Sequence, residues 1–138
     1  MQRASARLRS DFMQRYSAKM LEHFHAPRNP GALPDPQIVG RGSLDGRAPR
    51  TEIYVKFAGD VIQQVGFTTF GCGASIACAS VLTELISGRT VAKCREITAK
   101  TLIEALDGLP PDKEFCAQIV CEALNDLLRQ WDGLRCGR

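Results

Sequence analysis

The sequence predicts an α+β fold, and the order of its apolar patterns carries this prediction. Residues 52–57 alternate apolar and polar side chains, and a second alternating run follows at 61–70 after a short turn at 58–60. The rest of the chain has apolar residues three and four positions apart, which is the helical period. Strands that come first and helices that come afterwards are typical of an α+β domain.

The first expected element is a helix over residues 16–25, where Tyr16, Met20 and Phe24 share one face. Two prolines end this helix, and residues 31–50 are rich in glycine and proline. We therefore expect a loop or an irregular edge over 31–50. The two strands that follow are joined by so short a turn that they must be antiparallel.

Three helices are expected after the strands. The first runs from about 75 to 87 and is closed by Gly88, because glycine readily adopts the left-handed conformation that ends helices. The second starts after Thr98, a suitable N-cap, and reaches 107. The last runs from about 112 to 131 and carries a continuous apolar stripe.

Composition limits the function. The 138 residues fit one domain: a basic extension over 1–15 that we expect to be disordered, a single domain over 16–132, and a tail over 133–138. A net charge of +3 is too small to indicate a nucleic-acid partner. No apolar run is long enough to span a membrane, so no membrane partner is expected.

Six cysteines stand out in a chain that has no apolar secretory core near its start. We expect reduced thiols and a cytoplasmic location, with the mitochondrial matrix as the alternative that the arginine-rich start raises. No two cysteines have the CxxC spacing of zinc fingers or thioredoxins, which excludes both classes. Metal or sulfur chemistry remains as the use for these thiols.

Cys72 is the strongest candidate for a functional thiol. Glycines on both sides leave its side chain uncrowded and its backbone free to turn. It also precedes an expected helix N-terminus, where the helix dipole and free N–H groups favour a thiolate. The alternative, a small buried filler at a tight turn, fits these flanking residues less well.

The other thiols are weaker candidates. Cys116 lies in the first turn of the last helix and also on its apolar stripe, so a functional and a core role are both open. Cys78 is central on the buried face of its helix, and Cys121 borders the apolar stripe, so both are expected to be structural. His23 and His25 are expected at the surface.

Three ordered segments resemble the iron–sulfur cluster scaffold family, which includes IscU and the N-terminal domain of NifU. Residues 16–31 resemble the opening of that family, and the run Thr-Phe-Gly-Cys-Gly-Ala-Ser-Ile-Ala at 69–77 resembles its central cysteine motif. Leu-Pro-Pro-Asp-Lys at 109–113 is similar to its chaperone-recognition motif. The resemblance covers about residues 16–131. The residues that it implies in partner binding are Tyr16, Leu109, Pro110, Pro111 and Lys113.

The resemblance implies a small three-stranded, mostly antiparallel sheet packed against several helices, the SufE/NifU-like arrangement. It implies a scaffold or carrier, not an enzyme, that holds iron and a [2Fe–2S] cluster at Cys72 and Cys116. Sulfur would come from a cysteine desulfurase, and an Hsp70-type chaperone would help pass the cluster to recipient iron–sulfur proteins.

The chain departs from the family at three of five site positions. It has no cysteine and no Cys-Gly-Asp aspartate in the segment 46–51, and Phe115 replaces the histidine before the last cysteine. Because a cluster or a zinc ion needs four ligands, three outcomes are open. A second copy of the chain supplies two thiols, or weaker candidates fill in, or no metal binds. The weaker candidates are Asp45, Glu52, Cys78 and Cys121.

Two classes of function therefore remain. One is a scaffold for iron–sulfur assembly, and a zinc-binding variant is its close alternative. The other is an adaptor or sulfur carrier that binds the desulfurase or the chaperone without a cluster. In that case Arg47 and Arg50 near Cys72 would lower the pKa of its thiol and favour sulfur transfer.

Overall fold

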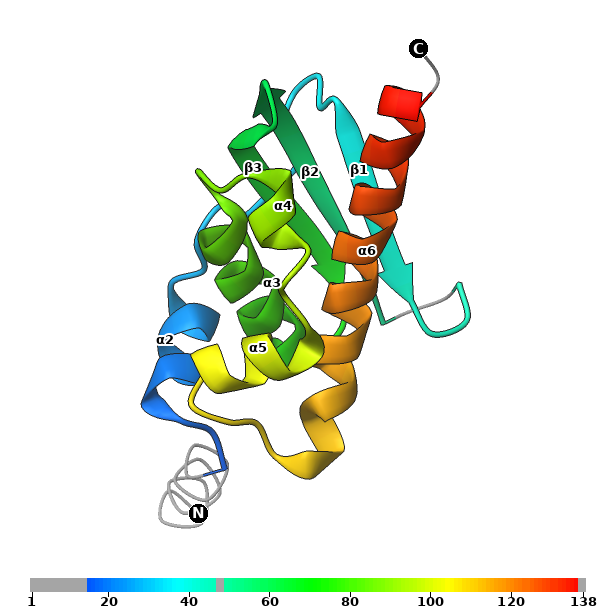
Figure 1. Cartoon of the computed structure of the whole chain (residues 1–138). Coiled ribbons are helices and arrows are strands. Elements are labelled where there is room, and N and C mark those ends of the chain that lie inside the picture. Colours follow the sequence, from blue (N-terminus) through cyan, green and yellow to red (C-terminus); the bar gives the residue numbers. More distant parts are fainter. Residues whose placement is uncertain (1–14, 47–48, 137–138) are drawn as a thin grey trace, which may run out of the picture.

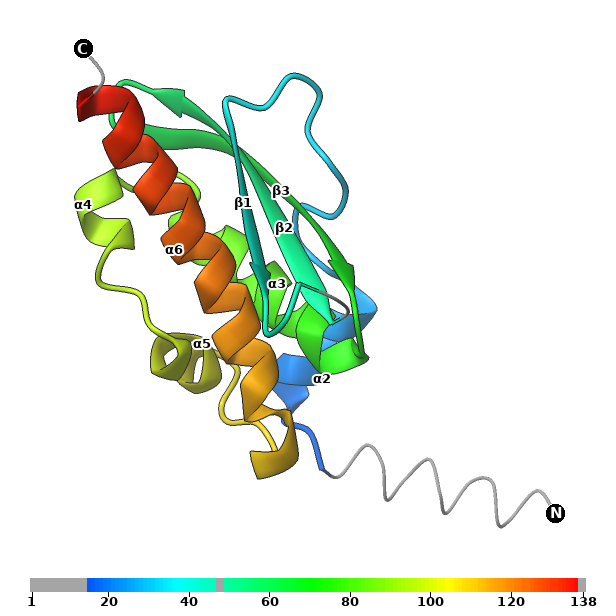
Figure 2. The same ribbon diagram turned by 90° about the vertical axis from the view of Figure 1, so that its right-hand side faces the viewer.

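A three-stranded antiparallel sheet organises the computed structural model, which describes residues 15–46 and 49–136. The strands β1 (Ile38–Ser43), β2 (Arg50–Ala58) and β3 (Val61–Phe70) lie in the order β1-β2-β3, and both neighbouring pairs are antiparallel. Helices cover one face of this sheet (Figures 1 and 2). The α+β prediction is confirmed.

The alternation in β2 and β3 produces a sheet with one buried face. In β2 the side chains of Thr51, Ile53 and Val55 are buried, whereas their neighbours are more exposed. Gly59 has a φ of +64° in the turn between the two strands. Glycine adopts this left-handed conformation without steric strain, because it has no Cβ atom, and this permits the tight hairpin.

The strand β1 corrects the expectation of a loop over 31–50. Its inward positions after Ile38 are Gly40 and Gly42, so the apolar alternation that reveals a strand is missing. A Cβ atom on either glycine would lie 2.2 Å from a backbone carbonyl oxygen of the last helix. The glycines therefore let that helix pack directly on the strand backbone.

Five α-helices and one short 3₁₀ helix complete the described residues. N-caps fix the starts of three of them: the Ser17 hydroxyl accepts from the Met20 N–H, the Thr90 hydroxyl accepts from the Lys93 N–H, and Thr98 forms a capping box with Thr101. The elements are α2 (Ala18–His25), α3 (Gly73–Ile86), α4 (Val91–Cys94), α5 (Ala99–Ala105), η1 (Pro111–Lys113) and α6 (Glu114–Cys136).

Several helix boundaries differ from the prediction. Helix α3 begins at Gly73, so Cys72 itself is the N-cap residue. Helix α6 continues to Cys136, past the expected end at residue 131, because no proline or capping glycine interrupts its last turns. The short α4 was not expected, since four residues are too few for a periodic pattern. The expected disordered extension lies largely outside the described residues.

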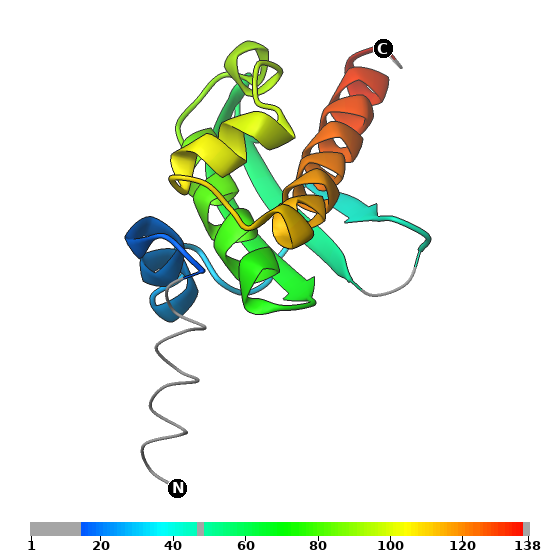
Figure 3. The ribbon, with the colours of Figure 1, turned by 90° about the horizontal axis from the view of Figure 1, so that it is seen from below.

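Helices α3 and α6 build the core against the sheet. Helix α6 packs on β1 and β2, α3 packs on β3 and on α6, and α2 packs on the side of α3. Seen from below, α3 and α6 both begin at the same end of the molecule (Figure 3). None of the described helices combines the length and the apolar character that crossing a membrane requires. The largest fully buried side chains include Ile53, Ile62, Leu82, Ile86, Leu124 and Leu127.

His23 corrects a second expectation, because it is buried and not at the surface. Only 3% of the residue is exposed, and its Nδ1 lies 2.7 Å from the Ser80 hydroxyl on α3. The same hydroxyl accepts a hydrogen bond from the Arg28 backbone N–H. Arg28 also forms ion pairs with Glu22 and Glu84. These contacts fasten α2 and the segment after it to α3.

Candidate functional site

The two thiols singled out by the sequence lie in contact. Cys72 lies two positions after the end of β3 and is the N-cap residue of α3, and Cys116 lies in the first turn of α6. Because α3 and α6 start at the same end of the molecule, 44 residues of chain separate two sulfur atoms only 3.6 Å apart. The structure therefore brings both primary candidates into one site.

This sulfur–sulfur distance suits a shared metal ion. Thiolates bind zinc or iron at about 2.3 Å with near-tetrahedral angles, which puts two sulfurs on one metal roughly 3.8 Å apart. The observed 3.6 Å is close to that value. The pair can therefore act as one half of a tetrahedral thiolate site with little movement of either helix.

Cys72 is the thiol that ionises more readily. Burial by itself would raise the pKa of Cys72, but hydrogen bonds from the Ser75 backbone N–H, the Cys116 thiol and the Ala74 backbone N–H outweigh it. The net result is a Cys72 pKa below the ordinary value. This is the effect expected where free N–H groups converge at a helix N-terminus.

Cys116 is the protonated partner. Burial raises the pKa of Cys116 to about 11, and the neighbouring Cys72 sulfur contributes to the rise against the opposing effects of Ser75 and Lys113. The Cys116 side chain is fully buried, whereas Cys72 is partly exposed. Cys72 thus accepts a hydrogen bond and faces solvent, and Cys116 lies behind it and donates.

Arg50, one of the two arginines expected to favour the Cys72 thiolate, contacts an aromatic ring. The Arg50 guanidinium lies 4.5 Å from the centre of the exposed Phe70 ring. Arg47 lies outside the described residues. The lowered pKa of Cys72 is therefore produced by the backbone of α3 and by Cys116, as the previous contacts show.

A small pocket adjoins Cys72. Its volume is about 200 Å³, and it lies between the N-terminus of α3, helix α2 and the segment before α6. Two partner-binding candidates, Tyr16 and Lys113, line it, and an ion pair between Arg15 and Asp112 closes one side. Its other lining residues are Met20, Leu21, Phe24, Cys72, Gly73 and Ala74.

The chaperone-motif candidates form the approach to Cys116. Leu109 is half-buried against the core, and Pro110 and Pro111 lead into η1, which ends at Lys113 just before α6. Phe115, which stands at the family's histidine position, is half-buried and packs on the same core. An aromatic ring at this position supplies packing and no ligand atom.

The four weaker ligand candidates do not join the pair. Glu52 forms an ion pair with Arg41 at 3.3 Å, on the side of β2 opposite its buried residues. Cys78 is fully buried, and Cys121 donates towards the Ile97 carbonyl. Asp45 lies after β1 in the segment before the undescribed residues 47–48. Within the described residues, no group of three or more histidine, cysteine or acidic side chains could hold a metal ion.

Sequence reasoning did not identify Ser75, which is the closest polar neighbour of the pair. Its hydroxyl lies 3.9 Å from the Cys72 sulfur, and the residue is only 2% exposed. The signal for it was its place in the first turn of α3, three positions after Cys72. Phe24, expected on one helix face with Tyr16 and Met20, is partly exposed, and its ring lies close to Gly73.

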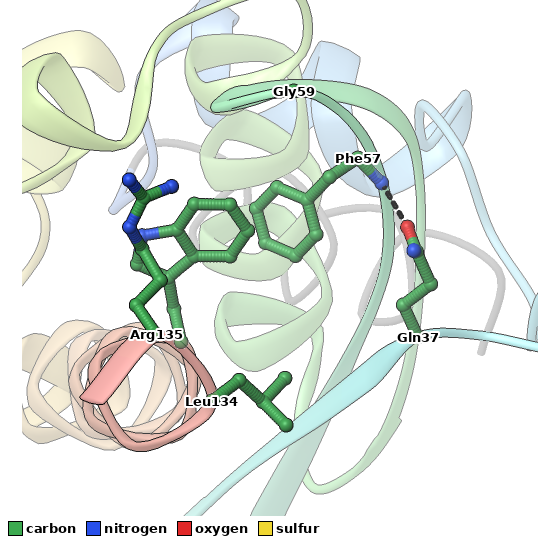
Figure 4. Close-up of a pocket in the computed structure, with 6 residues that line it drawn as sticks. Gln37, Phe57, Gly59, Leu134 and Arg135 are labelled. Atoms are coloured by element: carbon green, nitrogen blue, oxygen red, sulfur yellow. Dashed lines mark hydrogen bonds between the residues drawn. The ribbon is translucent and has the colours of Figure 1, made fainter. Parts of the chain in front are cut away.

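A second hollow lies at the far end of α6 (Figure 4). Phe57 packs on Trp131 with ring centres 4.3 Å apart, and Arg135 lies over the Trp131 ring. Cys116 and Trp131 are fifteen positions apart on one helix, a rise of about 22 Å. This hollow is therefore separate from the thiol pair.

Comparisons with known proteins agree with the geometry. The family described as the NifU-like N terminal domain matches residues 15–135. The iron–sulfur cluster assembly scaffold protein IscU of Aquifex aeolicus (strain VF5) is 39% identical over 118 residues, which cover 84% of this chain and 75% of that protein. The nitrogen fixation protein NifU of Azotobacter chroococcum mcd 1 is 36% identical over 120 residues, 86% of this chain and 39% of that protein.

Solved structures support the fold. The crystal structure of the SUF-system protein FiSufU from Fervidobacterium islandicum AW-1 has a TM-score of 0.67 at 21% identity, and the match covers 83% of this chain and 97% of that chain. The N-terminal part of a NifU-like protein from Brucella abortus has a TM-score of 0.55 at 19% identity, with 80% and 77% covered. The Aquifex aeolicus relative is named as a scaffold protein for iron–sulfur cluster assembly, and this chain belongs to the family of the NifU-like N-terminal domain.

Proposed function

We propose that the chain is a scaffold that accepts sulfur and iron at Cys72 and Cys116 and passes a [2Fe–2S] cluster to recipient proteins. The observation that carries this proposal is the 3.6 Å contact between the two sulfur atoms at the shared end of α3 and α6. That spacing suits two thiolates on one iron atom. The family supports the same cargo, because its named relatives assemble iron–sulfur clusters.

The two thiols have different tasks in this scheme. The partly exposed Cys72, whose pKa is lowered, is the nucleophile that takes sulfur from the persulfide of a cysteine desulfurase. Cys116 loses its proton when iron binds, because a metal ion stabilises the thiolate that burial disfavours. The cluster is cargo and leaves with the recipient, so both thiols return to their starting state.

The two remaining ligands come from a second copy of the chain. Each copy contributes Cys72 and Cys116, and four thiolates then surround one cluster. The weaker candidates are the alternative in cis, but Cys78 would have to leave a fully buried position. Glu52 would have to exchange its ion pair with Arg41 and cross the sheet. The homodimer requires neither change.

The surroundings of the pair provide the surfaces for protein partners. Tyr16 and Lys113 line the pocket beside Cys72, and Leu109, Pro110 and Pro111 lie between α5 and α6. We assign Tyr16 and the pocket beside Cys72 to binding of the desulfurase. We assign Leu109, Pro110, Pro111 and Lys113 to binding of an Hsp70-type chaperone. Reduced cysteines of this kind suit the cytoplasm or another compartment that keeps thiols reduced.

One observation favours a second function. Because the described residues contain two clustered ligands and not four, a sulfur carrier or adaptor that binds no cluster also fits the site. A zinc-binding form has the same ligand requirement as the cluster. Metal analysis separates these functions.

The test is anaerobic reconstitution with ferrous iron and sulfide, followed by measurement of iron, zinc and acid-labile sulfide. The scaffold proposal expects equal iron and sulfide in the wild type, and loss of both in Cys72→Ser and in Cys116→Ser. Cys94→Ser is the matched control, because Cys94 is a fully buried thiol on α4 outside the site. Zinc without sulfide would support the zinc form, and metal-free protein would support the carrier.

A further inference from the structure

The arrangement of the two thiols has a use beyond holding metal. Cys72 lines the pocket and Cys116 does not, while the Cys116 sulfur lies 3.6 Å from the Cys72 sulfur. A sulfur atom attached to Cys72 therefore has the pocket as its space, and the Cys116 sulfur remains behind the Cys72 sulfur. A sulfur atom that extends from Cys72 into the pocket would leave the Cys72 sulfur within reach of the Cys116 sulfur.

We propose that Cys116 is a resolving thiol that converts sulfur bound on Cys72 into free sulfide. The inference rests on the proposed function, because it needs Cys72 to accept sulfane sulfur as a persulfide. It adds an activity to the site: reduction of that sulfur by the protein's own pair of thiols. Sulfide, and not sulfane sulfur, is the form of sulfur that a [2Fe–2S] cluster contains.

The reaction is a thiol–disulfide exchange, and its atoms and electrons balance. The Cys116 sulfur attacks the Cys72 Sγ atom of the persulfide, and a bond between Cys72 and Cys116 forms. The bond between Cys72 Sγ and the outer sulfur breaks, and that sulfur leaves with the bonding electron pair and the Cys116 proton as hydrosulfide. The two cysteines are oxidised to a disulfide, and an external dithiol reduces them for the next cycle.

The distances permit this step. A disulfide has an S–S bond of about 2.05 Å, and the two sulfurs start 3.6 Å apart. Closing the remaining distance of about 1.5 Å needs small side-chain rotations. Cys72 is the N-cap residue of α3 and has an extended backbone conformation, so it lies outside the helix itself. No other described cysteine is in hydrogen-bond contact with either sulfur.

The leaving sulfide meets a suitable environment. Three apolar side chains of α2, Met20, Leu21 and Phe24, line one part of the pocket. Arg15 and Lys113 at its edge carry positive charge, although Asp112 pairs with Arg15. A hydrosulfide anion leaving through this pocket therefore passes two cationic side chains.

The test loads reduced, metal-free protein with inorganic polysulfide under anaerobic conditions, removes the reagent, and follows the intact mass. The wild type is expected to lose two hydrogen atoms, and peptide mapping should locate the disulfide between Cys72 and Cys116. Cys116→Ser and Cys116→Ala should instead gain one sulfur atom on Cys72 and keep it until a dithiol is added. Cys121→Ser should behave like the wild type, because Cys121 is a buried thiol on the same helix outside the site.

Two results overturn the inference, and they differ in what else they affect. A wild type that keeps the extra sulfur on Cys72 as long as Cys116→Ala does would remove the resolving role and leave sulfur acceptance intact. Absence of any extra sulfur on Cys72 in the Cys116 variants would remove both the inference and the proposed sulfur acceptance. Both Cys116 variants are used so that a folding defect in one does not decide the result.

Discussion

Substituting Gly42 by alanine tests how α6 is positioned, and with it Cys116. Gly42 lies on β1 directly under α6, and a Cβ atom there would lie 2.2 Å from the Ile119 carbonyl oxygen and 2.6 Å from the Ala123 nitrogen. Both are backbone atoms of α6. Neither can move without the helix, so α6 must retreat from the sheet.

The overlap sets the magnitude. Packed heavy atoms approach to roughly 3.5 Å, so α6 has to move by about 1 Å. Overpacking of this kind costs about 1–3 kcal/mol, and we expect about 3 kcal/mol because the opposing atoms are backbone. For a domain of this length that cost lowers Tm by roughly 10 °C. Since Ile119 is one turn after Cys116, the same shift separates the two thiols.

Thermal unfolding and anaerobic iron content are the measurements. Gly42→Ala is expected to lower both the Tm and the iron content. Gly133→Ala, on α6 itself, should instead raise stability by about 0.5–1 kcal/mol. Gly133 is the matched control because its added Cβ would meet nothing within 4 Å. A Tm loss below roughly 2 °C in Gly42→Ala would contradict the close packing of β1 on α6.

Three further predictions concern single side chains. Iodoacetamide labelling against pH should give Cys72 an apparent pKa below that of a free thiol, and Cys116→Ala should raise it by removing a hydrogen-bond donor; equal profiles would refute the thiol contact. Burial lowers the pKa of His23 in the folded protein below its ordinary value of 6.5. As the pH drops below about 6.5, His23 therefore binds a proton in the unfolded chain before it does so in the folded protein, and the free energy of unfolding should fall. Urea unfolding at about pH 7 and pH 5 should show this fall in the wild type and a smaller one in His23→Asn; equal slopes would contradict it. Thr98→Ala should cost about 1 kcal/mol in urea unfolding through loss of the α5 cap, and an unchanged midpoint would count against the capping box.

The fold could be predicted where the local sequence pattern depends on the element that contains it. The hairpin of β2 and β3 alternates visibly, and Gly88 and Thr98 mark helix ends that the structure confirms. Strand β1 could not be predicted from its own pattern. Its inward residues Gly40 and Gly42 are small because α6, about eighty positions later in the chain, packs directly on them. The sequence around the two glycines does not indicate this packing.

The sequence indicated the two candidate thiols but not how they are arranged. The positions of Cys72 and Cys116 at two helix starts were visible, and the family resemblance indicated that they act together. Which thiol is buried depends on how α6 packs, and the sequence left a core role for Cys116 open. In the structure Cys116 is fully buried and also contacts Cys72, which is compatible with either role. His23 was misplaced because its partner, Ser80, lies on another helix.

Native mass spectrometry of the anaerobically reconstituted protein tests the central claim, that Cys72 and Cys116 act together as half of a cluster site. The scaffold account predicts a species of two chains with two iron and two sulfide atoms, which Cys72→Ser and Cys116→Ser both abolish while Cys94→Ser keeps it. A colourless, metal-free monomer from the wild type after the same anaerobic treatment would contradict it.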